Sequence, residues 1–203
     1  MYMKKNKHTI SAEDNSAKPR YSKLKTFLRI IITIVSIGLI TTGLYLLALL
    51  FGPKYSFYLN KKMPEITDQN RVVVLDHGIN TAIYEGGVEV LENGAWHQYP
   101  ERGNPQTGGN FILAAHSFLW GYTPSHIMNK SFFYNLEDVK VGDQITVHWN
   151  KQAYTYTATE KFQIKPNDPA ILEASGGAKL TMYTCTEAGS ADGRVVVIAK
   201  PNN

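Results

Sequence analysis

Cysteine is nearly absent from the sequence, because Cys185 is the only one in 203 residues. A disulfide within the chain is therefore excluded. Internal repeats and low-complexity segments are also missing, which excludes a repeat architecture. The questions left by this composition are why one thiol is present and what surrounds it.

Excess positive charge is missing from most of the chain, although the sequence isoelectric point is about 9.0. Residues 1–29 carry eight Lys or Arg against two acidic residues, a net charge of +6. Since the whole chain has a net charge of +4, residues 30–203 sum to −2. The basic character belongs to the N-terminal tail, so the body of the protein gives no support for nucleic-acid binding.

Charge is absent altogether from Ile30 to Phe51, a run of 22 residues. As a helix this run would span about 33 Å, enough to cross a hydrocarbon core of about 30 Å. It is apolar on all sides, unlike a core helix with one apolar stripe. A cleaved signal peptide is the alternative, but no small-x-small cleavage site follows. We expect a single transmembrane helix at 30–51.

The distribution of basic residues around this helix predicts its orientation. They precede it and are few just after it, so the positive-inside bias places the N-terminus in the cytoplasm. We then expect a basic cytoplasmic tail at 1–29, a linker at 52–70 and an extracytoplasmic domain at 71–203. An unpaired cysteine in that compartment indicates a reactive thiol or an intermolecular bridge, with a buried, inert thiol as the alternative.

Short runs rich in Val, Ile, Thr and aromatic residues follow Arg71, and several alternate with period two. The predicted strands are 71–76, 81–85, 87–91, 110–115, 144–149, 152–159, 161–165, 179–184 and 194–199. One stretch, 123–139, favours one or two short helices with Ser125 as a possible cap. The pattern is mainly β and suggests a closed or nearly closed barrel.

A thiol attacks as the thiolate, so Cys185 needs a neighbouring base and a donor for the oxyanion that forms at a carbonyl. Of the six histidines, His116 ends the strand pattern "NFILAAHSF" as Cys185 ends its own. His97 is the best rival base, and His77 lies in a turn-like sequence. Arg194 is the only arginine after Cys185 and opens the last strand, so it is the candidate donor.

These residues resemble the signature of the sortase family, which are membrane-anchored cysteine transpeptidases. The family pattern is Thr-Leu-x-Thr-Cys, an arginine opening the next strand and an upstream histidine; here it reads "TMYTC" (181–185), Arg194 and His116. The likeness covers most of residues 71–200. Met182 replaces the usual Leu, a nearly volume-conserving change. Ala115 and Ser117 flank His116 where many members have Gly and Arg, which leaves substrate details open.

The resemblance implies an eight-stranded barrel with Cys185 as nucleophile, His116 as general acid and base, and Arg194 as stabiliser of the substrate or oxyanion. Thr184, Ala115 and Ser117 are then candidate substrate-binding residues. The implied reaction cleaves a Leu-Pro-x-Thr-Gly-like sorting signal of a secreted protein after Thr through a thioacyl-enzyme. It joins the product to an amine of a cell-wall precursor or pilin.

The subclass is less sharply indicated. The connector 52–70 lacks the Asp-Pro-aromatic lid of many pilus-building sortases, and "KPNDPAIL" (165–172) is similar to the small class D and E group, with a housekeeping-like enzyme as the alternative. Glu101, Asp168 and Glu173 have no spacing for a calcium loop, so we assign no metal and no cofactor. Two other functions stay open: a catalytically silent sortase-like binding module, and a cysteine hydrolase of cell-wall peptides.

Overall fold

The computed structural model describes residues 21–59, 66, 68–119, 121–166, 168–186 and 188–202. Residues 1–20 of the predicted basic tail and residues 60–65 and 67 of the predicted linker lie outside the described residues. The chain divides into two units at Leu44 and Tyr45. The β-structure lies wholly in the second unit.

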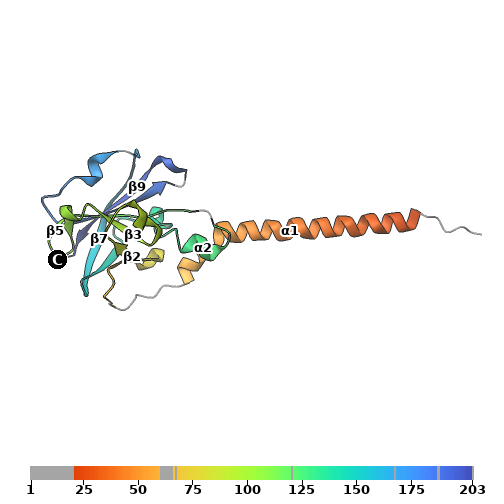
Figure 1. Cartoon of the computed structure of the whole chain (residues 1–203), viewed down its shortest axis with the longest axis horizontal. Helices are drawn as coiled ribbons and strands as arrows, with labels where there is room; N and C mark the ends of the chain where they lie inside the picture. The colour runs from red at the N-terminus through yellow and green to blue at the C-terminus, as the bar shows by residue number, and fades with distance from the viewer. Residues whose placement is uncertain are drawn as a thin grey trace, which may run out of the picture. The chain divides into compact units, whose positions relative to one another are not determined.

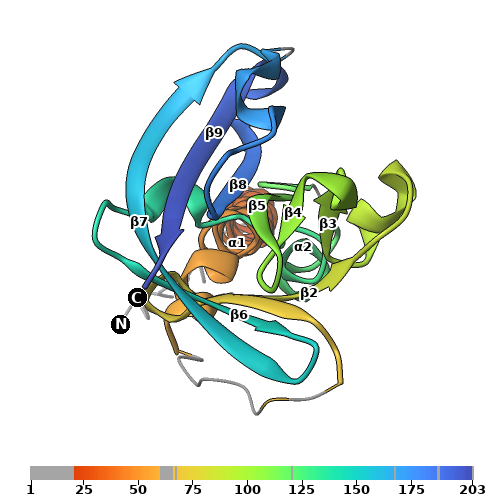
Figure 2. The same ribbon diagram turned by 90° about the vertical axis from the view of Figure 1, so that its left-hand side faces the viewer.

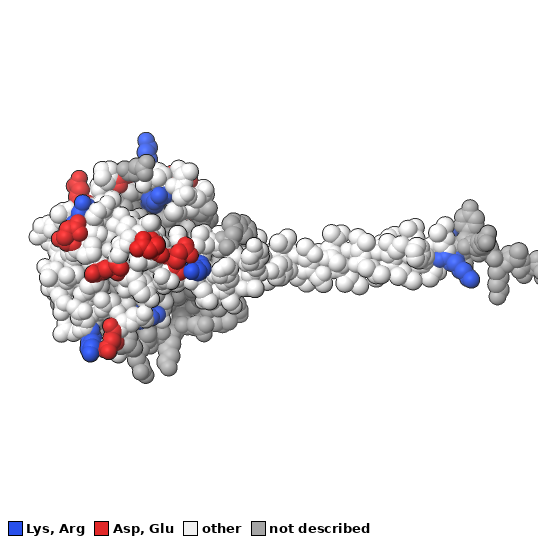
Figure 3. Space-filling model, viewed as in Figure 1, with Lys and Arg blue, Asp and Glu red and all other residues white. Residues whose placement is uncertain are grey.

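Helix α1 spans Tyr21–Leu59, and its segment Lys23–Gly52 is long and apolar enough to cross a membrane. Most of its large apolar side chains from Leu24 to Phe51 are exposed, and Figure 3 shows a long stretch of the helix without charge. The helix continues past Gly52 and Pro53, where the sequence predicted its end. A proline costs a helix one backbone hydrogen bond and a steric clash, yet it does not always end it.

Residues 71–202 form a closed barrel, as the sequence predicted. The strands are β1 (Arg71–Val74), β2 (Ile79–Tyr84), β3 (Ala95–Gln98), β4 (Gly103–Asn104), β5 (Gly108–Ala114), β6 (Gln144–Trp149), β7 (Gln152–Ile164), β8 (Lys179–Thr186) and β9 (Gly189–Pro201). Eight of them follow one another around the barrel in the order β3-β2-β1-β6-β7-β9-β8-β5, and β3 pairs with β5 to close it. The short β4 is attached to β5. Figures 1 and 2 show the barrel from two directions at right angles.

Three predicted strands take another form. Most of the predicted strand 87–91 is a 3-10 helix, Val88–Glu92, in which Val88 is 65% exposed. An apolar run in a strand needs a buried face, and this one has none. The predicted strands 152–159 and 161–165 are one strand, β7, with a bulge between Ala158 and Glu160. The bulge absorbs the break in alternation.

The expected short helix is present as α2, Pro124–Met128. Its cap is Thr123 rather than Ser125, because the Thr123 side chain accepts the hydrogen bond from the backbone N–H of His126. Proline at the first helical position fits this start, since its missing N–H has no partner there in any case. The rest of the stretch forms turns and a 3-10 helix, Leu136–Asp138.

The core lies inside the barrel, and a smaller apolar cluster lies on the outer face of β8 and β9. The inner cluster includes Phe111, Leu113, Leu180, Met182 and Val197, all at most 1% exposed. The outer cluster joins Val196 and Ile198 to Tyr183 and to Ile171 and Leu172 from the connection between β7 and β8. Strand β9 is therefore buried on both faces, which explains its continuous apolar run "VVVIA".

Candidate active site

Cys185 and Arg194 face each other across two adjacent strands. Cys185 lies near the end of β8 and is paired with Arg194 of β9 in the antiparallel register. Residues directly opposite in such a pair have Cβ atoms about 4.5–5.5 Å apart. A thiol of intermediate exposure therefore occupies the strand position directly opposite a permanently charged arginine.

His116 reaches the same place from the other side of β8. Strands β5 and β8 run parallel, and their register pairs Ala114 with Tyr183. Two residues further along each chain are His116 and Cys185, and side chains two apart share a face. The sequence prediction that both reactive side chains emerge at strand ends agrees with this register.

The end of β5 is held against β8 by hydrogen bonds on both sides of Ala115. The backbone N–H of Ala115 donates to the Tyr183 carbonyl at 3.3 Å, and the Thr184 hydroxyl donates to the Ala115 carbonyl at 2.6 Å. The His116 carbonyl accepts from the backbone N–H of Phe133 at 2.9 Å. Thr184 is 3% exposed, so its hydroxyl positions the histidine's strand end.

The guanidinium of Arg194 is held by its own hairpin. Nη1 donates to the Ser190 carbonyl at 2.8 Å and to the Gly193 carbonyl at 2.9 Å. The contacts described for this guanidinium involve Nη1 alone. A guanidinium carries five N–H groups, so those of Nε and Nη2 are the ones suited to bind a carbonyl or oxyanion.

Cys185, His116 and Arg194 line one cleft of about 440 Å³, together with Ala115 and Thr184. Ser117, the third candidate substrate-binding residue, is not part of its lining. The walls come from three further regions: Leu91, Trp96 and Gln98 around β3, Ile164 at the end of β7, and the connection from β7 to β8. The lining residues from that connection are Pro166, Asp168, Pro169, Ile171 and Leu172. The lining is mostly apolar, as is typical of ligand-binding clefts.

A buried amide anchors the wall between β7 and β8. Asn110 is 0% exposed, and its Nδ2 donates to the carbonyls of Ile171 at 3.0 Å and Glu173 at 2.7 Å. Its Oδ1 accepts from the Thr181 hydroxyl at 2.6 Å. Arg102 adds a hydrogen bond to the Leu172 carbonyl. A loop that carries cleft residues is thus tied to the rigid sheet.

Replacing Asn110 by alanine is expected to lower the free energy of unfolding by about 3 kcal/mol, because two buried polar groups and one part-buried carbonyl lose their partner. Urea unfolding of the chain in detergent, followed by tryptophan fluorescence, measures this loss. Asn202→Ala is the matched control, since Asn202 is exposed and its hydrogen bonds are to exposed side chains. A loss for Asn110→Ala no larger than that of the control would contradict the anchoring role.

Tyr183 forms part of the cleft floor as a neutral phenol. Burial raises the pKa of Tyr183 to about 12, against the opposing effect of the Arg194 charge. The phenol therefore stays protonated at physiological pH and donates a hydrogen bond to Gln98 Oε1. This contact links β8 to β3 across the cleft.

The rival histidines have structural partners away from the cleft lining. His97 is 1% exposed, with Nε2 bonded to the Gly103 carbonyl at 3.0 Å and Nδ1 to Glu85 Oε1 at 3.1 Å. Its ring also packs edge-on against Phe111, with centroids 4.8 Å apart. His77 Nε2 lies 2.6 Å from Asp143 Oδ2 in the turn after β1. Neither histidine is among the residues that line the cleft.

The sequence analysis did not identify the apolar cleft walls, nor the carboxylate that contacts His116. Glu92 Oε1 lies 3.6 Å from His116 Nε2, and Glu92 Oε2 lies 3.2 Å from Lys130 Nζ. The residue ends the 3-10 helix that the sequence pattern had indicated as a strand. No spacing signal connects residue 92 to residue 116, because the contact depends on the path of a loop.

The acidic residues considered as calcium ligands contact different parts of the protein. Asp168 Oδ1 accepts from the backbone N–H of Ala170 and so caps the 3-10 helix Pro169–Leu172. Glu101 lies 3.8 Å from Arg102, its neighbour in sequence. Within the described ranges, no group of three His, Cys, Asp or Glu side chains is arranged to hold a metal ion.

Comparison with known proteins identifies relatives of residues 71–202, which match the family model described as Sortase domain. The chain is 32% identical over 90 residues to YwpE of Bacillus subtilis (strain 168), a match that covers 44% of this chain and 79% of YwpE. It is 31% identical over 133 residues to Sortase A of Streptococcus agalactiae serotype III (strain NEM316). That match covers 64% of this chain but only 51% of the streptococcal protein.

Among solved structures, sortase A of Listeria monocytogenes superposes with a TM-score of 0.56 at 21% identity. The superposition covers 68% of this chain and 89% of that structure. At this identity the likeness concerns the fold. It agrees with the barrel described above.

Proposed function

The chain belongs to the sortase family, and from this premise we propose that it cleaves a Leu-Pro-x-Thr-Gly-like sorting signal after Thr and joins the new carboxyl end to an amine. Sortases as a family are sorting-signal transpeptidases of the cell envelope. The observation that carries the proposal is the meeting of Cys185, His116 and Arg194 in one cleft from three adjacent strands.

The first half of the reaction forms a thioacyl-enzyme. The Cys185 thiolate attacks the threonine carbonyl, and the N–H groups of Arg194 stabilise the charge that develops on the carbonyl oxygen. His116 donates a proton to the nitrogen of the departing amine, because an amide nitrogen leaves poorly without one. The C–N bond breaks and a thioester on Cys185 remains.

The second half consumes the thioester. An incoming amine attacks the same carbonyl, His116 accepts a proton from it, and the C–S bond breaks to restore the Cys185 thiolate. Water in place of the amine gives hydrolysis. The isolation of Cys185 suits this role, since a second cysteine nearby could capture the thiol as a disulfide.

We extend the proposal to location. Helix α1 is consistent with a membrane anchor, and the basic residues before its apolar segment favour a cytoplasmic N-terminus. The barrel is then extracytoplasmic, where secreted proteins with C-terminal sorting signals and cell-wall precursors are both within reach. No nucleic acid takes part.

The test uses the full chain in detergent micelles with a Leu-Pro-x-Thr-Gly peptide and triglycine, followed by mass spectrometry of enzyme and products. A thioacyl adduct and a triglycine-joined product are expected. An adduct that yields hydrolysis product with every amine offered would favour the cysteine hydrolase. Absence of an adduct across a panel of sorting-signal peptides would favour the silent binding module.

Arg194→Lys is expected to lower kcat/KM for the peptide by about 100-fold, the usual cost of losing one oxyanion donor. Lysine keeps the charge but lacks the planar array of donors, so the loss reports hydrogen-bond geometry. Initial-rate kinetics with a fluorogenic Leu-Pro-x-Thr-Gly peptide measure this loss. Arg71→Lys is the control, because Arg71 lies in β1 and bonds to Asn80 and Gln69. Equal rates for Arg194→Lys and wild type would remove Arg194 from the mechanism.

A further inference from the structure

A second cleft, of about 400 Å³, lies next to the one that contains Cys185. Its lining consists of Asn80, Glu92, Asn93, Met128, Asn129 and Phe132. These residues come from β2, the end of the 3-10 helix Val88–Glu92, α2 and the chain after α2. The lining is rich in side-chain amides and contains one carboxylate, which is the chemistry that binds a cation and a peptide backbone.

Contacting residues connect the two clefts at His116, which lines the first of them. Leu91 lines the first cleft and Glu92 the second, while Glu92 Oε1 lies 3.6 Å from His116 Nε2. Phe132 lines the second cleft, and the next residue, Phe133, donates its backbone N–H to the His116 carbonyl. A group bound at Glu92 is therefore adjacent to the imidazole that must take its proton.

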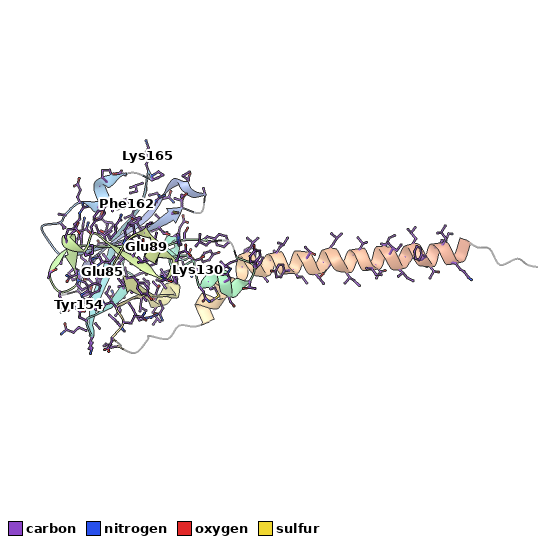
Figure 4. All side chains as sticks on the ribbon, in the orientation of Figure 1. Glu85, Glu89, Lys130, Tyr154, Phe162 and Lys165 are labelled. Atoms are coloured by element: carbon purple, nitrogen blue, oxygen red, sulfur yellow. The ribbon has the colours of Figure 1, made fainter. Side chains whose placement is uncertain are left out.

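Glu92 of this cleft already binds one primary ammonium group, which belongs to the protein. Lys130 Nζ lies 3.2 Å from Glu92 Oε2 and donates to the Glu92 backbone carbonyl at 2.7 Å. Figure 4 shows Lys130 on the same face as Glu85 and Glu89, and Figure 3 shows the carboxylates that gather there. Their field favours the approach of a cation.

Transpeptidation needs a site for the second substrate that the acyl chain does not fill. The peptide is expected in the first cleft, so the amine must reach the thioester from another side and still contact His116. We propose that the second cleft binds the acceptor, a primary ammonium on a peptide-like backbone, through Glu92 in exchange with Lys130. This inference rests on the proposed transpeptidase function.

The step balances in atoms and charge. The ammonium bound by Glu92 gives one proton to neutral His116, and the resulting amine forms a C–N bond with the thioester carbonyl. The C–S bond breaks, and a second proton from nitrogen goes to the Cys185 thiolate. The products are an amide, the thiol and a protonated His116, which returns its proton to solvent.

The experiment measures how the thioacyl-enzyme partitions between amine-joined and hydrolysed product in the full chain in detergent. This ratio does not depend on how fast the intermediate forms. With triglycine, Glu92→Gln is expected to lower the ratio about fivefold, in the range for one partly exposed charged hydrogen bond. Lys130→Met removes the competing ammonium and is expected to raise the ratio about threefold. Glu160→Gln, an exposed change of the same kind on β7, is the matched control and leaves it unchanged.

Repeating the measurement with hydroxylamine as the nucleophile distinguishes a role of Glu92 in binding the acceptor from a role in orienting His116. Hydroxylamine is a small nucleophile that is mostly uncharged at pH 7, so Glu92→Gln is expected to change its ratio less than twofold. If the triglycine and hydroxylamine ratios fall together, Glu92 acts by orienting His116 and the acceptor site is refuted. Unchanged triglycine ratios in both variants also refute it. Failure of the transpeptidase proposal looks different, because wild type would then form no thioacyl adduct or would give only hydrolysis product with every amine offered.

Discussion

Replacing Cys185 by alanine is expected to abolish the thioacyl adduct and to lower peptide cleavage by at least about 10⁴-fold, since removing a covalent nucleophile leaves only binding and oxyanion stabilisation. The side chain lies at the end of β8 opposite Arg194 and is only partly buried. A change to alanine removes one sulfur from the cleft wall and leaves the barrel core intact. The measurement combines mass spectrometry of the enzyme with initial-rate kinetics.

Cys185→Ser sharpens this result. Serine keeps the size and the hydrogen-bonding capacity, but its hydroxyl ionises far less readily than a thiol at neutral pH. We expect the serine variant to be as inactive as the alanine variant, with both melting within a few degrees of wild type. Substantial cleavage by either folded variant would show that the reaction does not pass through a thioester on Cys185.

The barrel could be predicted from sequence because its strands carry strong local signals. The run 144–149 became β6 with the same bounds, and "KLTMYT" forms most of β8. Strand β3 was missed, although it closes the barrel, because "AWHQ" is short and its burial depends on partners far away in sequence. Its pairing with β5 joins Trp96 to Ala114, and no local pattern encodes that contact.

The candidate site shows the same difference between positions that local sequence predicts and contacts that depend on the tertiary fold. His116, Cys185 and Arg194 each follow or open an apolar run, so their strand-end positions could be read locally. Glu92 ends a 3-10 helix whose amino-acid composition is typical of a strand. Its closeness to His116 results from the tertiary path of residues 85–94, which sequence periodicity does not report.

In the proposed reaction, the amide bond of the sorting signal makes His116 the second most sensitive position. An amine leaves with difficulty unless it is protonated, so His116→Ala is expected to lower kcat/KM for the peptide about 10³-fold. A peptide thioester has a leaving group that needs no such help. With the thioester in place of the scissile amide, we expect the loss of the acylation rate to shrink to about tenfold.

This comparison decides what His116 does, because a residue that only supports the fold would affect both substrates alike. The matched control is His126→Ala, since His126 lies in α2, is exposed and is not part of the cleft lining. It is expected to cleave both substrates at wild-type rates. Equal losses on amide and thioester for His116→Ala would assign the imidazole to positioning Cys185, with the leaving amine protonated by another group.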